Sequence, residues 1–182
     1  MNIEQIEKHV IRIAKVADTA AIFAFDLIAQ GDEKRQDFIR QSIERGLCTV
    51  AKVDGEAVAY IIMERSFFGW PFIDLVYVHT DYRQYGYATA LMQHIEAQCE
   101  EKLFTSTNLS NLRMQHLLEK LGYSISGVVH NIDEGDPEVF YFKRPVKTAD
   151  ESGYNTAQHA QLAAFDDGTE QPILTLDFHN ML

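Results

Sequence analysis

The chain has 182 residues, of which 46% are hydrophobic, and it carries a formal net charge of -11 at neutral pH. This length and this apolar share suit one globular domain with a packed core. Contacts with nucleic-acid phosphates need clustered lysine and arginine, so the acidic balance argues against a nucleic-acid partner. An acidic surface suits a cationic substrate such as an amine, although acidity that serves only solubility explains the charge equally well.

Nothing in the sequence indicates export, membrane insertion or a metal site. No apolar run is long enough to span a bilayer, and residues 1–5 lack a basic region followed by an apolar core. The two cysteines, Cys48 and Cys99, show no metal or redox spacing and are expected to be reduced core residues. The seven histidines are scattered without ligand spacing. We therefore expect a cytoplasmic protein without a bound metal.

The N-terminal segment predicts a strand followed by two helices. Residues 10–16 alternate between apolar and polar side chains, as in a half-buried strand. Asp18 is a good N-cap for a helix that would end near Gly31. A second helix is expected over about residues 33–45 and would end at Gly46, because glycine favours helix C-termini.

A hairpin and a turn are expected next. Residues 47–53 and 56–64 flank Asp54-Gly55, which is a strong signal for a two-residue hairpin. Residues 66–71 then predict a turn into the next strand. Their aromatic side chains could form a substrate wall or close the loop, and loop closure is the safer prediction.

The stretch from Phe72 to Cys99 organises the rest of the chain. An apolar strand over residues 73–78 leads into the turn Arg-Gln-Tyr-Gly-Tyr-Ala, residues 83–88, which opens an amphipathic helix. Gly86 allows the backbone to come close to a ligand. The amides of residues 84–89 lie at a helix N-terminus, where the macrodipole favours an anion. Together with the basic Arg83, the turn predicts a pyrophosphate site.

A second unit of the same kind follows. Residues 103–107 predict a short strand, Asn111 follows it, and a helix with leucines on one face ends at Gly122-Tyr123. Two final strands are expected over residues 124–130 and 139–144.

Residues 73–91 resemble the acetyl-coenzyme A motif of the GNAT N-acetyltransferase superfamily, (Q/R)-x-x-G-x-(G/A), here Arg83 to Ala88. The second unit resembles the family signature of strand, Asn, helix and Gly-aromatic. The resemblance, to members of bacterial type, covers about residues 10–145. It implies an α/β (α+β) fold with a mixed sheet of about six to seven strands and about four helices. The domain would span residues 1–146, and residues 147–182 would form an acidic C-terminal extension.

The resemblance also implies a binding mode for the co-substrate acetyl-CoA. Backbone amides from Gln84 to Thr89 would hold the pyrophosphate, and the backbone around Tyr77 and Val78 would pair with the pantetheine arm. Asn111 would hydrogen-bond near the pantetheine and is also a plausible helix N-cap. The expected cofactor-binding residues are Tyr77, Val78, Arg83, Gln84, Tyr85, Gly86, Tyr87, Ala88, Thr89 and Asn111.

The implied reaction is direct transfer of an acetyl group to a primary amine of a small molecule or protein. The backbone amide of Val78 would polarise the thioester oxygen. Asp74 is the candidate base, although alternation along the strand could turn it away from the site, and a water-relayed base is the competitor. Many family members carry a Tyr seven residues after the signature Asn. That position is Leu118 here, and Tyr123 is expected in the core, so no side-chain acid is assigned.

The acidic segment over residues 131–138 has two interpretations. Its Asp, Gly and Pro residues favour a solvated turn. Alternatively, Asp133 or Glu134 attracts or orients the ammonium group of the substrate.

Several features leave alternatives open. In the extension, residues 155–165 predict a short helix and residues 173–178 a strand. The missing tyrosine and the uncertain base keep a second function in play, a non-catalytic acyl-CoA-binding sensor or interaction module. Because dimers through sheet edges or tails are common among relatives, a homodimer is a reasonable expectation.

Overall fold

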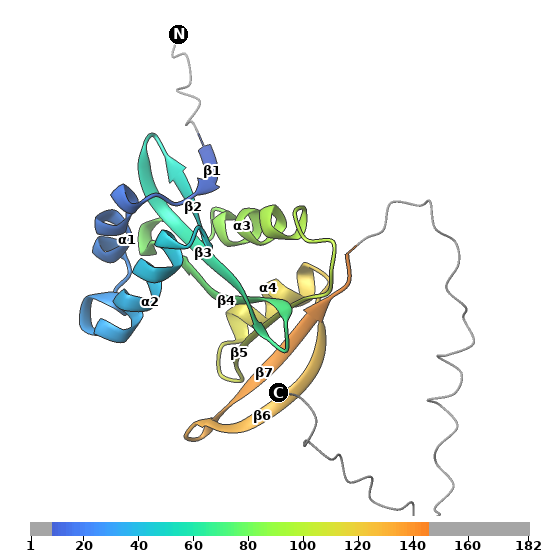
Figure 1. Cartoon of the computed structure of the whole chain (residues 1–182). Coiled ribbons are helices and arrows are strands. Elements are labelled where there is room, and N and C mark those ends of the chain that lie inside the picture. Colours follow the sequence, from blue (N-terminus) through green and yellow to red (C-terminus); the bar gives the residue numbers. More distant parts are fainter. Residues whose placement is uncertain (1–8, 146–182) are drawn as a thin grey trace, which may run out of the picture. The chain divides into compact units, whose positions relative to one another are not determined.

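The computed structural model describes residues 9–145, which form a mixed sheet with helices on both faces (Figure 1). The extension over residues 147–182, with its predicted helix at 155–165 and strand at 173–178, lies outside the described residues.

Within residues 9–145, seven strands form one sheet in the order β1-β2-β3-β4-β5-β7-β6. The strands are β1 (His9–Ile13), β2 (Cys48–Val53), β3 (Glu56–Phe67), β4 (Trp70–Val78), β5 (Leu103–Asn108), β6 (Ser124–Asp133) and β7 (Asp136–Lys143). Neighbouring strands are antiparallel except β4 and β5, which run parallel. The predicted fold class, with its mixed sheet and four α-helices, is confirmed.

Two hydrophobic cores cover opposite faces of the sheet. Helices α1 (Thr19–Phe25) and α2 (Glu33–Glu44) pack on the face that carries Tyr60 and Ile62. Helices α3 (Tyr87–Glu96) and α4 (Leu112–Lys120) pack on the face that carries Ala59 and Ile61. Successive residues of β3 point to opposite faces, so each helix pair covers its own side. The apolar positions that predicted α3, among them Leu91, are fully buried.

The predicted helix from Asp18 to Gly31 is wrong in its length. Helix α1 ends at Phe25, and Ala29–Gly31 forms a separate 3₁₀ turn. Asp26, the residue directly after Phe25, is fully buried. Its carboxylate accepts hydrogen bonds from the amides of Ile28 and Ala29. These local bonds to the side chain compete with continued helix and end α1.

Asp18 occupies the N-cap position of α1, as predicted, but its side chain does not cap the helix. The Asp18 carboxylate accepts two hydrogen bonds from Arg12, at 2.8 and 2.9 Å. It also forms an ion pair with Lys52 at 3.1 Å. The Arg12 guanidinium, more than any other contact, lowers the pKa of the Asp18 carboxyl. Tertiary charge pairs therefore occupy the oxygens that would have capped the helix. In α2, by contrast, Asp32 caps the helix by accepting from the Lys34 and Arg35 amides.

Two hairpins differ in how well the sequence predicts them. Asp54 and Gly55 have φ of 48° and 93°, which confirms the two-residue turn between β2 and β3. The predicted turn over residues 66–71 is too long, because both strands continue and only Phe68 and Gly69 turn. The Phe67 ring packs on aromatic rings of three other strands. These are Phe72, Phe104 and Phe140, with centroids 5.1–5.3 Å from Phe67. This packing lengthens the hairpin.

The acidic segment over residues 131–138 is a hairpin end and not a linker. Strands β6 and β7 continue to Asp133 and Asp136, which face each other across a turn at Glu134-Gly135. The predicted solvated turn is therefore present, but it is confined to Glu134 and Gly135. Strand pairing extends into a segment whose Asp, Gly and Pro composition favours turns.

Candidate active site

The strands β4 and β5 separate in the middle of the sheet. They pair only at Phe72 with Phe104 and Ile73 with Thr105, while β4 continues beside β3 as far as Val78. The His79 amide donates to the Val58 carbonyl. Since facing residues of antiparallel strands alternate between bonded and non-bonded pairs, the amides of Val76 and Val78 point away from β3. The gap between β4 and β5 is thus lined by backbone polar groups that an extended ligand could bind.

A tight turn carries the chain from β4 into α3. Gln84 and Gly86 both have left-handed backbones, with φ of 71° and 89°. The Ala90 amide donates to the Gly86 carbonyl at 2.9 Å, which is the first hydrogen bond of the helix. The amides of Ala88 and Thr89 consequently have no acceptor inside α3. The positive end of the helix and these amides form an anion-binding surface.

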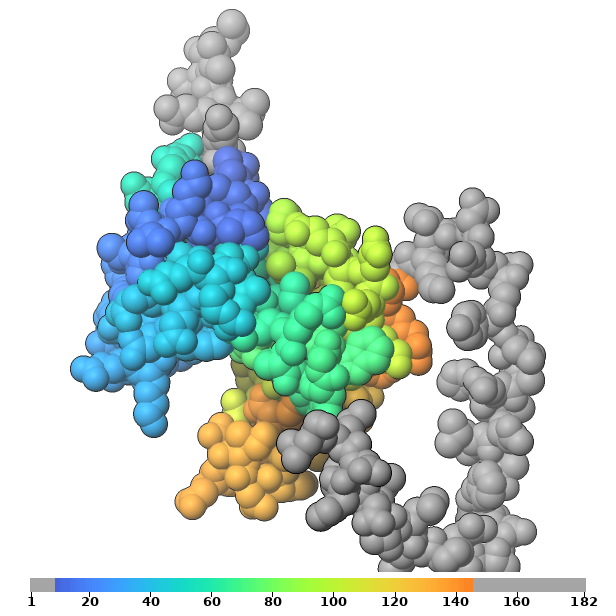
Figure 2. Space-filling view, viewed as in Figure 1, coloured from blue at the N-terminus to red at the C-terminus, as the bar shows by residue number. Residues whose placement is uncertain are grey.

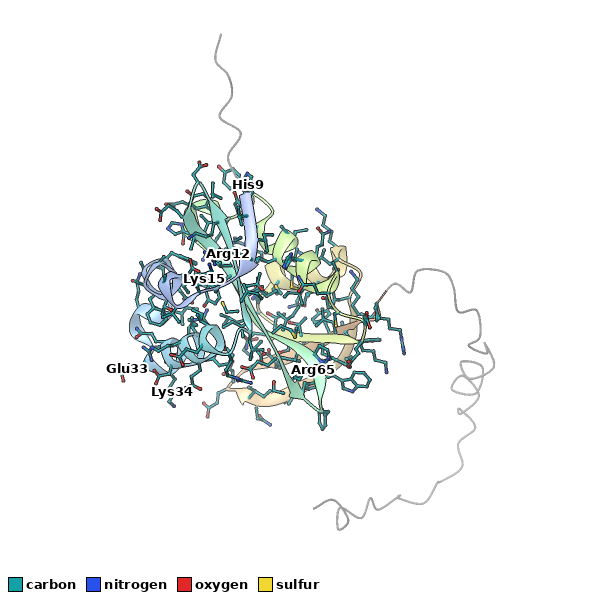
Figure 3. All side chains as sticks on the ribbon, turned by 45° about the horizontal axis from the view of Figure 1, so that its top comes forward. His9, Arg12, Lys15, Glu33, Lys34 and Arg65 are labelled. Atoms are coloured by element: carbon teal, nitrogen blue, oxygen red, sulfur yellow. The ribbon has the colours of Figure 1, made fainter. Side chains whose placement is uncertain are left out.

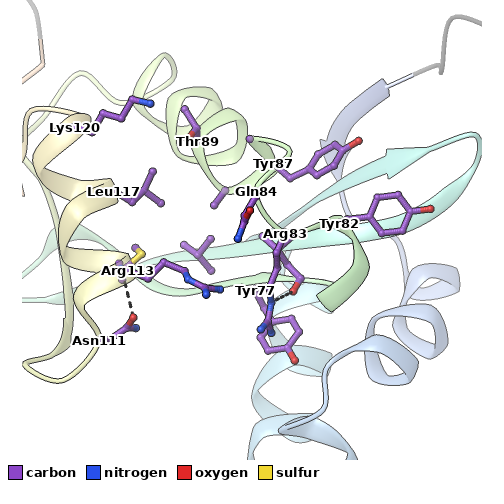
Figure 4. Close-up of a pocket in the computed structure, with 15 residues that line it drawn as sticks. Tyr77, Tyr82, Arg83, Gln84, Tyr87, Thr89, Asn111, Arg113, Leu117 and Lys120 are labelled. Carbon is purple, nitrogen blue, oxygen red and sulfur yellow. Dashed lines mark hydrogen bonds between the residues drawn. The ribbon is translucent and has the colours of Figure 1, made fainter.

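A cavity of about 750 Å³ opens in front of this turn (Figure 4). It is lined by Val76, Tyr77, Val78, Tyr82, Arg83, Gln84, Gly86, Tyr87, Ala88, Thr89, Asn111, Arg113, Met114, Leu117 and Lys120. The structure therefore brings all the predicted cofactor residues to one cavity except Tyr85, which is 76% exposed and lies outside the lining.

Sequence reasoning missed most of the wall that α4 contributes. Arg113, Met114, Leu117 and Lys120 line the cavity together with Asn111. Their spacing of three and four residues puts them on one face of the helix, so a helical projection from Asn111 would have found them. Val76 was missed as well.

Asn111 is the N-cap of α4, as predicted. Its Oδ1 accepts from the Met114 amide at 3.2 Å, and its Nδ2 donates to Thr107 Oγ1 at 3.0 Å. These two bonds fix the side chain at the edge of the cavity (Figure 4).

Arg83 folds back onto β4. Its Nε donates to the Val78 carbonyl at 3.3 Å, and its guanidinium carbon lies 5.8 Å from the centre of the Tyr77 ring. Tyr77 in turn stacks on Tyr60 and accepts a hydrogen bond from the Leu27 amide on its hydroxyl. Tyr77 therefore connects the cavity with the segment that follows α1.

Asp74 lies where β4 leaves β5. Ile62 faces Leu75 and the next residue, Met63, faces Ile73, so Asp74 is the extra residue of a β-bulge. Asp74 is exposed to solvent along part of its surface. Its carboxyl group, however, is partly shielded from water by neighbouring atoms. This desolvation and the nearby Glu64 charge raise the pKa of Asp74 to about 6.

The sequence position at which many family members carry an acidic tyrosine holds Leu118. Leu118 is fully buried between α4 and the sheet. Tyr123 is 5% exposed, and burial raises the pKa of its hydroxyl, which agrees with the predicted core position. Cys48 is buried too, and burial raises the pKa of its thiol to about 12. Neither the Tyr123 hydroxyl nor the Cys48 thiol is therefore ionised at neutral pH, and neither is a nucleophile there.

The β6–β7 hairpin binds the loop that carries Asn111. Asp133 accepts from Asn108 Nδ2 at 2.8 Å, and Asp136 accepts from both the amide and the hydroxyl of Ser110. The Leu109 amide donates to the Pro137 carbonyl at 2.7 Å. Two carboxylates of the acidic segment therefore hold the β5–α4 loop in place.

Two further findings concern the residues from 9 to 145. Within them, no group of three or more His, Cys, Asp or Glu side chains is arranged to hold a metal ion. None of their helices is long and apolar enough to cross a membrane.

Comparison with known proteins identifies the family. Residues 16–123 match the model of the acetyltransferase (GNAT) family. A GNAT-family acetyltransferase from Bacillus cereus is 30% identical, covers 77% of this chain and 99% of its own, and superposes with a TM-score of 0.71. The chain therefore belongs to the GNAT acetyltransferase family, which confirms the resemblance found in the sequence.

More distant structures share the fold. The ribosomal-protein-S18-alanine N-acetyltransferase of Escherichia coli is 19% identical, with a TM-score of 0.67 over 81% of this chain and 100% of its own. The protein yncA of Salmonella typhimurium, solved with its cofactor acetyl-CoA, is 18% identical, with a TM-score of 0.62 over 78% of this chain and 96% of its own. No curated protein matches the sequence.

Proposed function

We propose that the protein is an N-acetyltransferase that moves the acetyl group of acetyl-CoA to a primary amine by direct attack. One observation carries the proposal. The separation of β4 from β5, the left-handed turn at Gly86 and the N-terminus of α3 open on the same cavity. Family membership and the acetyl-CoA in the yncA structure support acetyl-CoA as the ligand.

The cavity suggests how the co-substrate lies. The amides from Gln84 to Thr89 would bind the pyrophosphate, and Arg83 would add positive charge. The pantetheine arm would follow the free edge of β4 at Tyr77 and Val78. Asn111 would contact it from the opposite wall. The thioester would then lie towards the point where the two strands meet.

The chemistry of the transfer requires polarisation and a base. The Val78 amide, which points away from β3, is the proposed donor to the thioester oxygen. Asp74 is the proposed base, because a carboxyl with a pKa of about 6 is ionised at neutral pH and still basic enough to accept the ammonium proton. A water between Asp74 and the amine is the alternative route.

The acceptor amine would enter from the side of the sheet that α1 and α2 cover only in part. In the space-filling view, a hollow separates α2 from the β6–β7 hairpin (Figure 2). Asp133 and Glu134 belong to this hairpin and are proposed to orient the ammonium group. Asp133 already binds Asn108, which leaves Glu134 as the more available carboxylate.

A second function is favoured by Leu118. Leu118 occupies the sequence position of the tyrosine that protonates the leaving thiolate in many family members, and an acyl-CoA-binding sensor would not need that proton. Because a thiolate is a fair leaving group, an enzyme without such an acid is also chemically reasonable.

One experiment separates the two functions. Thermal unfolding is measured with and without acetyl-CoA, and thiol release is then followed over a panel of primary amines. A concentration-dependent rise in melting temperature is expected in both cases. Thiol release that depends on one amine supports the transferase, and stabilisation without release on any amine supports the sensor. Unchanged melting would contradict the acetyl-CoA site itself.

The location and the oligomeric state are proposed on simpler grounds. The free cysteines suit the reducing cytoplasm. The outer edge of β6 has no neighbouring strand in the described part of the chain, and its Ile125, Val128 and Ile132 are exposed. Such an edge is a surface for pairing with a second copy, so a homodimer is proposed. Light scattering of the purified chain tests it.

A further inference from the structure

The cavity is basic in a strongly acidic protein. The chain carries a net charge of -11, yet Arg83, Arg113 and Lys120 line the cavity and none of its described lining residues is acidic. A single pyrophosphate would be served by the α3 N-terminus and one cation. Three cations indicate that the ligand brings more negative charge than a pyrophosphate alone.

Two of these cations are unused inside the protein. Arg83 is engaged with the Val78 carbonyl and the Tyr77 ring. Arg113 and Lys120 are exposed and make no hydrogen bond or ion pair with the rest of residues 9–145. Ordering long cationic side chains towards a cavity brings no internal stabilisation here, so their position is best explained by a ligand.

The two cations lie at different places along the cavity. They are seven residues apart on α4, which separates them by about 10 Å along the helix axis. In the close-up, Lys120 lies at the same end as Thr89, whereas Asn111 and Tyr77 mark the other end, and Arg113 lies between (Figure 4). A ligand that places its pantetheine near Asn111 and its pyrophosphate at Gly86 would extend its nucleoside towards Lys120.

We infer that Lys120 binds the 3′-phosphate of the coenzyme's ribose, and that Arg113 assists the pyrophosphate. This inference rests on the proposed acetyl-CoA site and adds the group that distinguishes coenzyme A from its dephosphorylated form. At the Lys120 end, the adenine ring carries no charge, so the ribose phosphate is the anion left for an ammonium group to pair with. The Lys120 ammonium is a flexible point charge, which suits a phosphate at the mouth of a cavity.

The test compares two ligands, coenzyme A and 3′-dephospho-coenzyme A, by calorimetric titration of the full chain. The unaltered protein should bind coenzyme A roughly fivefold more tightly, as expected for one partly exposed charge pair. In Lys120→Met this preference should fall to nearly one, because only coenzyme A loses a contact. Lys120→Arg should retain the preference, and high salt should reduce it in the unaltered protein.

Two control variants make the assignment specific. Lys34→Met removes the same charge from α2, where Lys34 is exposed and projects away from the body of the molecule (Figure 3), and it should leave both affinities unchanged. Arg113→Met should weaken both ligands alike. The melting temperature of each variant without ligand verifies that it folds.

The outcomes separate this inference from the function on which it rests. Equal losses for both ligands in Lys120→Met, or no loss for either, would overturn the role of Lys120 while leaving the acetyl-CoA site intact. If the unaltered protein bound neither ligand, the acetyl-CoA site and the inference would fall together.

Discussion

The two halves of the molecule that meet at β4 are built in different ways. The coenzyme half, from β4 to α4, presents mainly backbone groups, namely the free edge of β4 and the amides at the start of α3. The proposed acceptor half, α1–α2 with the β6–β7 hairpin, is held by side chains that are distant in sequence, such as Asp26 with Tyr60. Backbone binding sites are encoded by short motifs, whereas side-chain networks are not. This difference explains why the sequence names a cofactor and no acceptor.

The largest effect should come from Gly86→Val in the coenzyme half. Gly86 has a φ of 89°, and a Cβ at this position would meet nothing within 4 Å, so the new side chain would project into open space beside the cavity. A β-branched residue at this φ is strained, and its methyl groups would displace the anion. Acetyl-CoA binding should fall by about 100-fold or more, measured by titration.

The matched control for this change is Gly55→Val, which has a φ of 93° in the β2–β3 hairpin. It should lower the melting temperature by a similar strain and leave acetyl-CoA affinity unchanged. Equal affinity losses in both variants would show that the Gly86 effect is general destabilisation.

The acceptor half should be broken most strongly by Asp26→Ala. Its buried carboxylate accepts from Arg35 at 2.8 Å and from Tyr60, and truncation leaves a partly buried guanidinium without its carboxylate partner. We expect a loss of about 3 kcal/mol in the free energy of unfolding, measured in urea. Acetyl-CoA affinity under native conditions should change less than about twofold, because Asp26, Arg35 and Tyr60 do not line the cavity and reach it only through the Tyr77 ring.

The exposed Asp37, which pairs with Arg40 on α2, provides the comparison. Asp37→Ala should cost less than about 0.5 kcal/mol. If Asp26→Ala abolished acetyl-CoA binding in a folded protein, the two halves would not be separable.

The next largest effect is expected at Asp74, which lies on β4, where the two halves meet. Asp74→Asn should lower kcat at pH 7.5 by about 100-fold, as expected for loss of a general base, with little change in acetyl-CoA affinity. The pKa of about 6 is raised, so the basic form predominates above pH 6 and kcat should fall as the pH drops through 6. Glu64→Gln removes a neighbouring negative charge that raises the pKa of Asp74. In this variant the fall in kcat should therefore begin at a lower pH. If kcat fell at the same pH in Glu64→Gln as in the unaltered protein, the base would be a group other than Asp74.

The smallest effect should separate the two roles of Asn111. Asn111→Ala removes the cap of α4 and should cost about 1 kcal/mol of stability. Asn111→Ser retains a capping oxygen and loses the Nδ2 group, with its bond to Thr107 Oγ1 and its proposed contact to the pantetheine. Both variants should therefore weaken acetyl-CoA binding, and the alanine variant, which also loses the cap, should lower the melting temperature more. Full affinity in the serine variant would restrict Asn111 to its capping role.

Where sequence prediction failed, a tertiary contact outweighed a local preference. The capping preference of Asp18 was overridden by Arg12 and Lys52, which reach it from β1 and β2. The predicted turn over residues 131–138 was shortened to Glu134 and Gly135 by pairing of β6 with β7. Leu118 and Tyr123, in contrast, were read correctly as a position without the family tyrosine and as a core residue.

By itself, the sequence determined the order of the elements, the family and the residues of the coenzyme turn. Those features depend on local backbone conformations that glycine, capping residues and apolar periodicity encode over a few positions. Only the tertiary structure decided that Asp74 occupies a bulge at the strand junction and that Arg113 and Lys120 line the same cavity as Gly86. These positions depend on where β4 stops pairing with β5 and on which face of α4 meets the sheet, and both follow from packing between segments far apart in the chain.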